Sequence, residues 1–128
     1  MARVLILLFV AGGLGTLVRF GVIRAFATPA PAVFPWGTVA VNCAGSLLCG
    51  LVYGLATALD WAPEWRTTIL VGFLGALTTF STLTLESVLL AQGDRLVAAF
   101  ANLIVSVAAG LVCLWAGLTF ARAFVGGD

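Results

Sequence analysis

The sequence predicts an all-α membrane protein with one domain over residues 1–128. It has four transmembrane helices, and the third is broken near the bilayer midplane. The first observation is composition: the chain is 62% hydrophobic and only 9% charged, which is too little charge to cover a soluble core. The second is the length of four apolar segments, because a span needs about 20 residues. The third is a helix-weakening sequence inside the third segment.

Short polar connections separate the apolar segments. The predicted spans are residues 4–26, 36–59, 66–91 and 96–125, and the connections are residues 28–35, 60–65 and 92–95. The connections contain the prolines and most of the acids, which favours turns at the water interfaces. Aromatic residues of the kind that anchor helices at these interfaces lie beside them: Trp36, Trp61 and Trp65.

The helix-weakening sequence, residues 72–82, contains two glycines and a run of threonine and serine. Both features lower helix propensity. Backbone groups without hydrogen bonds are costly in lipid, so a break is tolerated only where protein buries it or where it lines a cavity. A broken helix at this depth indicates an ion or substrate site.

Polar residues form two rows at helical spacing, which places each row on one helix face. Such rows are either hydrogen-bonding contacts between helices or the wall of a pathway. The rows are Thr38, Asn42 and Ser46 in the second span, and Asn102, Ser106 and Gly110 in the fourth.

Two charged residues lie well inside the spans. Arg19 either extends to the interface or attracts anions to a vestibule. Glu86 is the only acid within a span; it pairs with Arg19 or a hydroxyl, or carries protons. Arg19 and Arg24 also interrupt the apolar run before the small-residue sequence at 25–27, so we expect a retained span rather than a cleaved signal peptide.

Several classes of function are disfavoured. A net charge of +1 indicates no nucleic-acid partner. The chain has no histidine and no nucleophile–base pair at recognisable spacing, so we do not expect an enzyme. Cys43, Cys49 and Cys113 lack the spacing of a zinc site or a disulfide framework, and we expect them to be packing residues.

The chemistry near the break favours a small anion. Glycines and threonines free carbonyl oxygens, which are ligands for hard cations. Phe80 offers an electropositive ring edge, and hydroxyls and amides add donors. A cation pathway would more often carry rings of carboxylates.

The distribution of arginines predicts weak orientation in the membrane. Arg3, Arg66 and Arg122 fall on one side, and Arg24 and Arg95 fall on the other. Since positive charge sets topology, either this small excess fixes one orientation or the chain inserts both ways. Insertion both ways favours an antiparallel two-fold homodimer.

Three motifs on the first three spans resemble those of the CrcB/Fluc fluoride channels, and the similarity extends along the whole chain. They read Gly12-Gly13-x-Gly15-x-x-x-Arg19, Gly37-Thr38-x-x-x-Asn42-x-x-Gly45-Ser46 and Gly72-Phe73-x-Gly75-x-x-Thr78-Thr79-Phe80-Ser81-Thr82.

The resemblance implies a dual-topology antiparallel homodimer in a prokaryotic inner membrane, with two pores for passive fluoride export. It implies a structural sodium ion at the dimer centre, held by backbone carbonyls at Gly75 and Thr78. Arg19 and Glu86 match charged family positions. The implied fluoride pathway comprises Asn42, Phe80, Thr38, Ser81, Thr82, Ser106 and Asn102.

Two positions depart from the family pattern. Leu83 stands where a second phenylalanine is common, which removes one ring edge per chain. Asn102 stands where many members have tyrosine, although its amide still donates hydrogen bonds.

Two other functions fit the size of the chain. A small dual-topology multidrug exporter would need an acid in the first span, and that span has Arg19 and no acid. A non-transporting assembly subunit would use the polar rows only to join helices.

Overall fold

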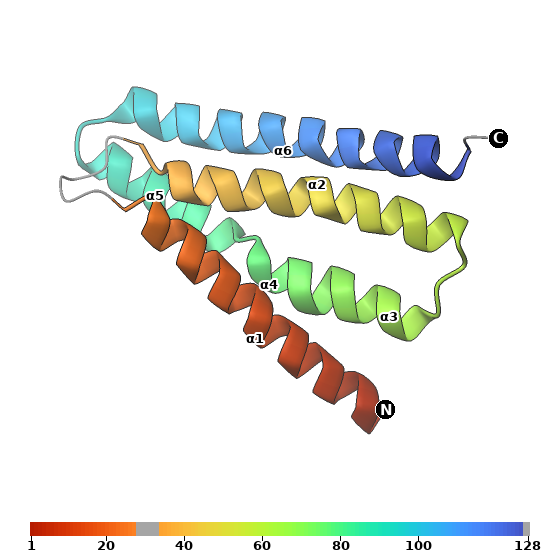
Figure 1. Cartoon of the computed structure of the whole chain (residues 1–128). Coiled ribbons are helices and arrows are strands. Elements are labelled where there is room, and N and C mark those ends of the chain that lie inside the picture. Colours follow the sequence, from red (N-terminus) through yellow and green to blue (C-terminus); the bar gives the residue numbers. More distant parts are fainter. Residues whose placement is uncertain (28–33, 127–128) are drawn as a thin grey trace.

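The computed structural model describes residues 1–27 and 34–126. Within these ranges four helical segments are long and apolar enough to cross a membrane: Ala2–Ala25, Trp36–Ala58, Pro63–Gln92 and Leu96–Val125. The predicted all-helical fold with four spans is therefore confirmed. Figure 1 shows α2 and α6 running side by side, with the third span beneath α2 and α1 diverging from the others.

Three of the spans are single helices, and the other is a composite of shorter helical segments. The first, second and fourth spans are α1 (Ala2–Ala25), α2 (Trp36–Ala58) and α6 (Leu96–Val125). The third comprises α3 (Pro63–Thr67), the π-helix η1 (Thr68–Leu74), α4 (Gly75–Leu77) and α5 (Phe80–Gln92).

The break in the third span lies between α4 and α5. Thr78 has ψ of 156° and Thr79 has φ of −147° and ψ of 117°, so both are extended. The Thr79 side chain then caps α5 by accepting a hydrogen bond from the Thr82 amide. The predicted break within residues 72–82 is confirmed, and the π-helix before it is an additional distortion that the sequence analysis did not predict.

The connections differ in part from the predicted ones. The predicted connection 60–65 is too long, because α3 already begins at Pro63. Proline suits a first helical turn, where its missing N–H would have no partner. The next residue, Glu64, pairs with Arg3 at 2.9 Å. Most of the predicted connection 28–35 lies outside the described residues.

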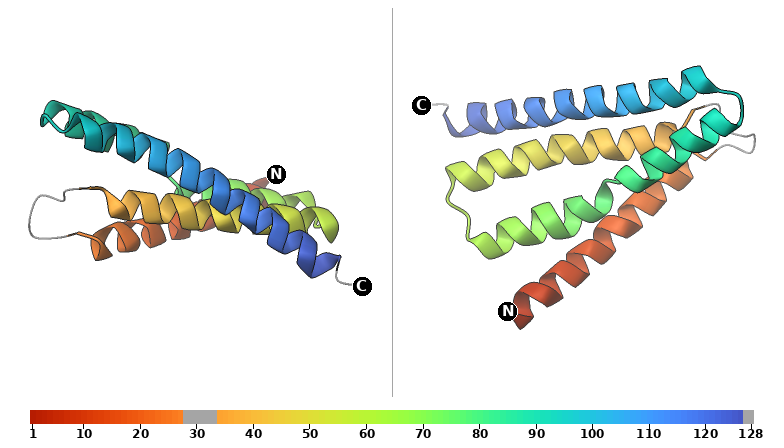
Figure 2. Two further views of the ribbon diagram at one scale, coloured as in Figure 1. Left: turned by 90° about the horizontal axis from the view of Figure 1, so that it is seen from above. Right: turned by 180° about the vertical axis from the view of Figure 1, so that it is seen from behind.

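The parallel helices α2 and α6 approach each other through glycines. A Cβ atom at Gly50 would overlap the carbonyl oxygen of Leu114, and one at Gly117 would overlap the carbonyl oxygen of Leu47. The two backbones are therefore in direct contact, as close packing at small residues in membrane helices requires. Figure 2 shows α6 crossing α2 obliquely, so the close contact occupies only part of their length.

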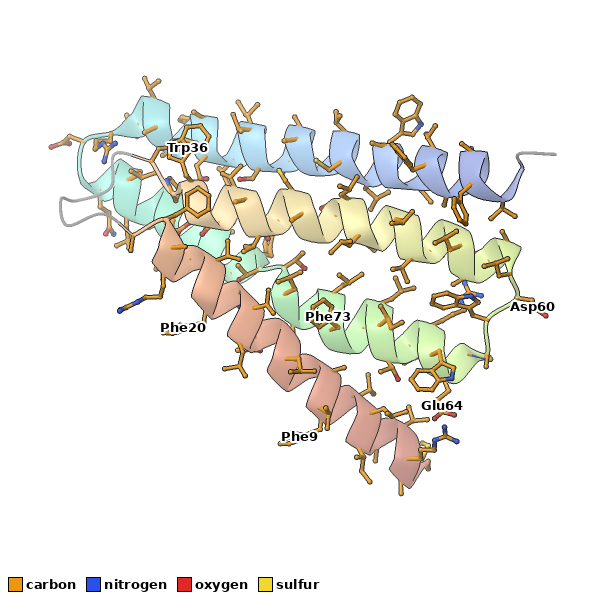
Figure 3. The ribbon with its side chains drawn as sticks, viewed as in Figure 1. Phe9, Phe20, Trp36, Asp60, Glu64 and Phe73 are labelled. Atoms are coloured by element: carbon orange, nitrogen blue, oxygen red, sulfur yellow. The ribbon has the colours of Figure 1, made fainter. Side chains whose placement is uncertain are left out.

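Helix α1 packs on the third span along one narrow stripe. Gly15 is its only buried residue among those described, and a Cβ there would overlap the Phe73 carbonyl oxygen. Phe9 and Phe20 on its outer side are 84% and 63% exposed, and Figure 3 shows both rings pointing away from the other helices. This outer side of α1 is left to lipid or to a partner chain.

Replacing Gly117 by alanine tests the backbone contact of α2 and α6. The added methyl group forces the two helices apart, and overpacking of this kind costs about 1–3 kcal/mol. We expect a lower midpoint of thermal unfolding in detergent. The matched control is Gly21→Ala, because a Cβ at Gly21 meets nothing within 4 Å; an equal effect of both substitutions would contradict the packing.

Candidate functional site at the helix break

Asn42 of α2 holds the broken backbone through both of its polar atoms. The Thr79 amide donates to Asn42 Oδ1 at 2.8 Å, and Asn42 Nδ2 donates to the Thr79 carbonyl at 3.2 Å. In an unbroken helix the Thr79 amide would donate to the Gly75 carbonyl. The side-chain amide thus replaces a backbone partner and frees the Gly75 carbonyl from the helical ladder.

Arg19 of α1 also reaches the break. Its Nη1 atom donates to the Thr78 carbonyl over a long distance of 3.5 Å. The guanidinium is therefore directed to the extended residues rather than only toward the water interface. Arg19 and Asn42 bring two separate helices onto adjacent carbonyls of the break.

Hydroxyl groups gather at the start of α5. Thr79 Oγ1 donates to Thr82 Oγ1 at 3.0 Å and lies 3.3 Å from Ser81 Oγ. It also accepts from the Thr82 amide at 3.2 Å. The structure thus brings the predicted residues Ser81 and Thr82 together, around a threonine that the sequence analysis placed in a motif but did not assign to the site.

A cavity of about 320 Å³ lies between α2, the break and α6. Three of the predicted pathway residues, Asn42, Phe80 and Ser106, line it together with Leu83. The Phe80 side chain is 74% exposed, whereas Leu83 is buried. An aromatic ring, an amide and a hydroxyl therefore surround one space, and the leucine that departs from the family pattern forms part of its wall.

Thr38 and Glu86 form a separate polar pair nearer the start of α2. Thr38 Oγ1 donates to Glu86 Oε1 at 2.8 Å. Both line a second cavity of about 400 Å³ with Trp36 and Arg95. Of the two partners predicted for Glu86, the structure shows a hydroxyl, that of Thr38, whereas Arg19 donates to the Thr78 carbonyl at the break. The other oxygen, Glu86 Oε2, is buried without a hydrogen-bond partner among the described residues.

Asn102 lies inside the contact of α5 with α6. It is fully buried, and its Nδ2 atom donates to Ser87 Oγ at 3.0 Å. Ser87 in turn donates to the Leu83 carbonyl at 2.8 Å, and Ser106 donates to Asn102 Oδ1 at 3.4 Å. Asn102 does not line either cavity described above. Its amide joins two helices here, and its place on an ion path stays a prediction.

The sequence analysis did not single out Ser87 as a site residue. Its position one residue after Glu86 puts a second polar group on a different face of α5, which was the available signal. In the row of the second span, Thr38 and Asn42 both form hydrogen bonds with the third span.

Substituting Asn42 tests its hold on the break. In Asn42→Ala the amide and carbonyl of Thr79 lose their partners, and a buried unsatisfied polar group costs about 1–3 kcal/mol. We expect a lower unfolding midpoint and faster hydrogen exchange at Thr79. Ser46→Ala, one turn along and beside the same cavity, is the control. Equal exchange at Thr79 in both variants would contradict this role of Asn42.

Comparison with known proteins agrees with this architecture. Residues 6–118 match the family described as CrcB-like protein, Camphor Resistance (CrcB). A protein of Hahella chejuensis is 41% identical over 119 residues, covering 92% of this chain and 94% of the relative. One from Pseudomonas putida strain KT2440 is 45% identical over 114 residues, covering 88% and 92%.

A third relative, from Symbiobacterium thermophilum, is 45% identical over 117 residues, covering 88% of this chain and 93% of the relative. The first two relatives are named fluoride-specific ion channel FluC, and the third is named fluoride-specific ion channel FluC 1. The family match covers most of the chain, and these relatives align over nearly their full length. The chain therefore belongs to the CrcB family.

Proposed function

We propose that this chain forms a fluoride-selective channel through which fluoride leaves the cytoplasm passively. Family membership and the names of the relatives support this function. The observation that carries it is the cavity at the break, where Asn42, Phe80 and Ser106 meet. Fluoride is small and strongly hydrated, so a pathway has to replace its water with several closely spaced donors.

Several residues at the cavity supply contacts that can replace the water around fluoride. One N–H of the Asn42 side-chain amide donates to the Thr79 carbonyl, and the second N–H remains a donor for the anion. The Ser106 hydroxyl and the electropositive edge of Phe80 add further favourable contacts for an anion. The positive charge of Arg19, directed to the Thr78 carbonyl, raises the local anion concentration.

Neither alternative function gains support from the site. The first span contains no acid that could exchange protons for a cationic drug. A subunit that only assembles would need the polar rows for helix contacts, which describes Asn102 and Ser87. It does not account for a ring and donors around a cavity.

The channel is proposed to be an antiparallel homodimer. Gly75, whose carbonyl has lost its helical donor, and Phe80 are exposed on the single chain. A free carbonyl facing lipid is costly, so a second copy is the natural cover for this surface. The nearly even division of arginines, three on one side against two on the other, supports insertion in both orientations.

A sodium ion at the centre of this dimer is proposed to bind backbone carbonyls of the break. The freed carbonyl of Gly75 fits a hard cation. The Thr78 carbonyl fits less well, because it already accepts from the Arg19 guanidinium. The ion would supply positive charge between two anion pathways and stabilise the extended backbone.

Fluoride efflux from proteoliposomes tests the channel function. We expect rapid fluoride release when a potassium ionophore is added to vesicles that contain potassium fluoride. From vesicles that contain potassium chloride, we expect chloride release no faster than from protein-free vesicles. The hydrogen-bond donors that line the cavity favour the smaller anion. Absence of fluoride release, or equal chloride release, would overturn the assignment.

Replacing sodium by N-methylglucamine at equal ionic strength tests the cation site. We expect a lower unfolding midpoint and a larger monomer fraction without sodium, since a ligand that binds only the folded dimer stabilises it by mass action. Light scattering in detergent reports the oligomeric state separately. A dimer whose stability is the same in both salts would contradict the sodium site and leave the dimer intact.

A further inference from the structure

A chain of hydrogen bonds runs from the cavity at the break into the contact of α5 with α6. Ser106, which lines the cavity, donates to Asn102 Oδ1 at 3.4 Å. Asn102 Nδ2 donates to Ser87 Oγ at 3.0 Å, and Ser87 donates to the Leu83 carbonyl at 2.8 Å. The three polar side chains are buried, so these bonds are sheltered from solvent.

The Leu83 carbonyl fixes the direction of every donor in this chain. A carbonyl oxygen only accepts, so the single hydroxyl hydrogen of Ser87 is used on Leu83. Toward Asn102, Ser87 can then only accept, and only the NH₂ group of an amide can donate to it. The amide oxygen of Asn102 therefore faces Ser106. Because that oxygen also only accepts, the Ser106 hydrogen points to Asn102.

An anion in the cavity therefore meets the oxygen lone pairs of Ser106 rather than its hydrogen. A serine has only one hydrogen to donate, so Ser106 can serve the anion only by turning away from Asn102. That turn leaves the fully buried amide oxygen of Asn102 without a hydrogen-bond donor. A buried acceptor without a donor is costly, so the amide opposes the turn.

We propose that Asn102 is a positioning residue that holds the Ser106 hydrogen away from the cavity and so weakens fluoride binding there. This inference rests on the proposed channel function. A conducting site has to bind its ion strongly enough for entry and weakly enough for exit. Asn102, which does not line the cavity, would thus set the fluoride concentration at which the pathway saturates.

The experiment measures initial fluoride efflux from proteoliposomes over a range of internal fluoride concentrations. Asn102→Leu removes both polar atoms of the amide at similar side-chain size and frees the Ser106 hydrogen for the anion. We expect the half-saturating concentration to fall about threefold to tenfold, the worth of one net hydrogen bond. The maximal rate should not rise, because a more tightly bound ion leaves more slowly.

Two further variants separate this role from a structural one. Ser87→Ala removes the group that orients the amide, so it should lower the half-saturating concentration as well, and it decides the question if Asn102→Leu does not fold. In a Ser106→Ala background neither substitution should shift the half-saturating concentration. A merely structural role of Asn102 would act equally in both backgrounds.

The outcomes distinguish this inference from the channel function. If the variants saturate at the wild-type fluoride concentration or above it, or shift equally with and without Ser106, the positioning role is wrong and the channel function stands. Absence of fluoride release from the wild-type protein would overturn both.

Discussion

The hydrogen bonds between Asn42 and Thr79 are the interaction on which the rest of the site depends. A helix broken inside a bilayer has backbone groups that water cannot reach. Here the side-chain amide of Asn42 forms hydrogen bonds with both the N–H and the carbonyl of Thr79. This pairing lets Thr78 and Thr79 remain extended. It also frees the Gly75 carbonyl and turns Phe80 toward the cavity.

The contact of α2 with α6 positions this amide. Glycines allow the two backbones to touch, so the wall that carries Ser106 is held at a defined distance from the wall that carries Asn42. Helix packing and the arrangement of the cavity are thus consequences of one helix interface rather than independent features.

Local sequence signals accounted for the fold well. Hydrophobicity and length predicted the four spans, and glycine and threonine predicted the break, because both are properties of short stretches of chain. The predicted connection at 60–65 is too long because Pro63 begins a helix instead of continuing the loop. The π-helix and the burial of Asn102 were not predicted, since both depend on neighbouring helices.

By itself the sequence determined which segments cross the membrane, where one of them breaks, which polar residues share a helix face, and the family to which the chain belongs. Only the tertiary structure decided the partners: Asn42 with Thr79, Glu86 with Thr38, and Asn102 with Ser87. The reason is geometric. Spacing along a helix defines its faces, but the height and rotation of one helix against another follow from side-chain packing across the interface.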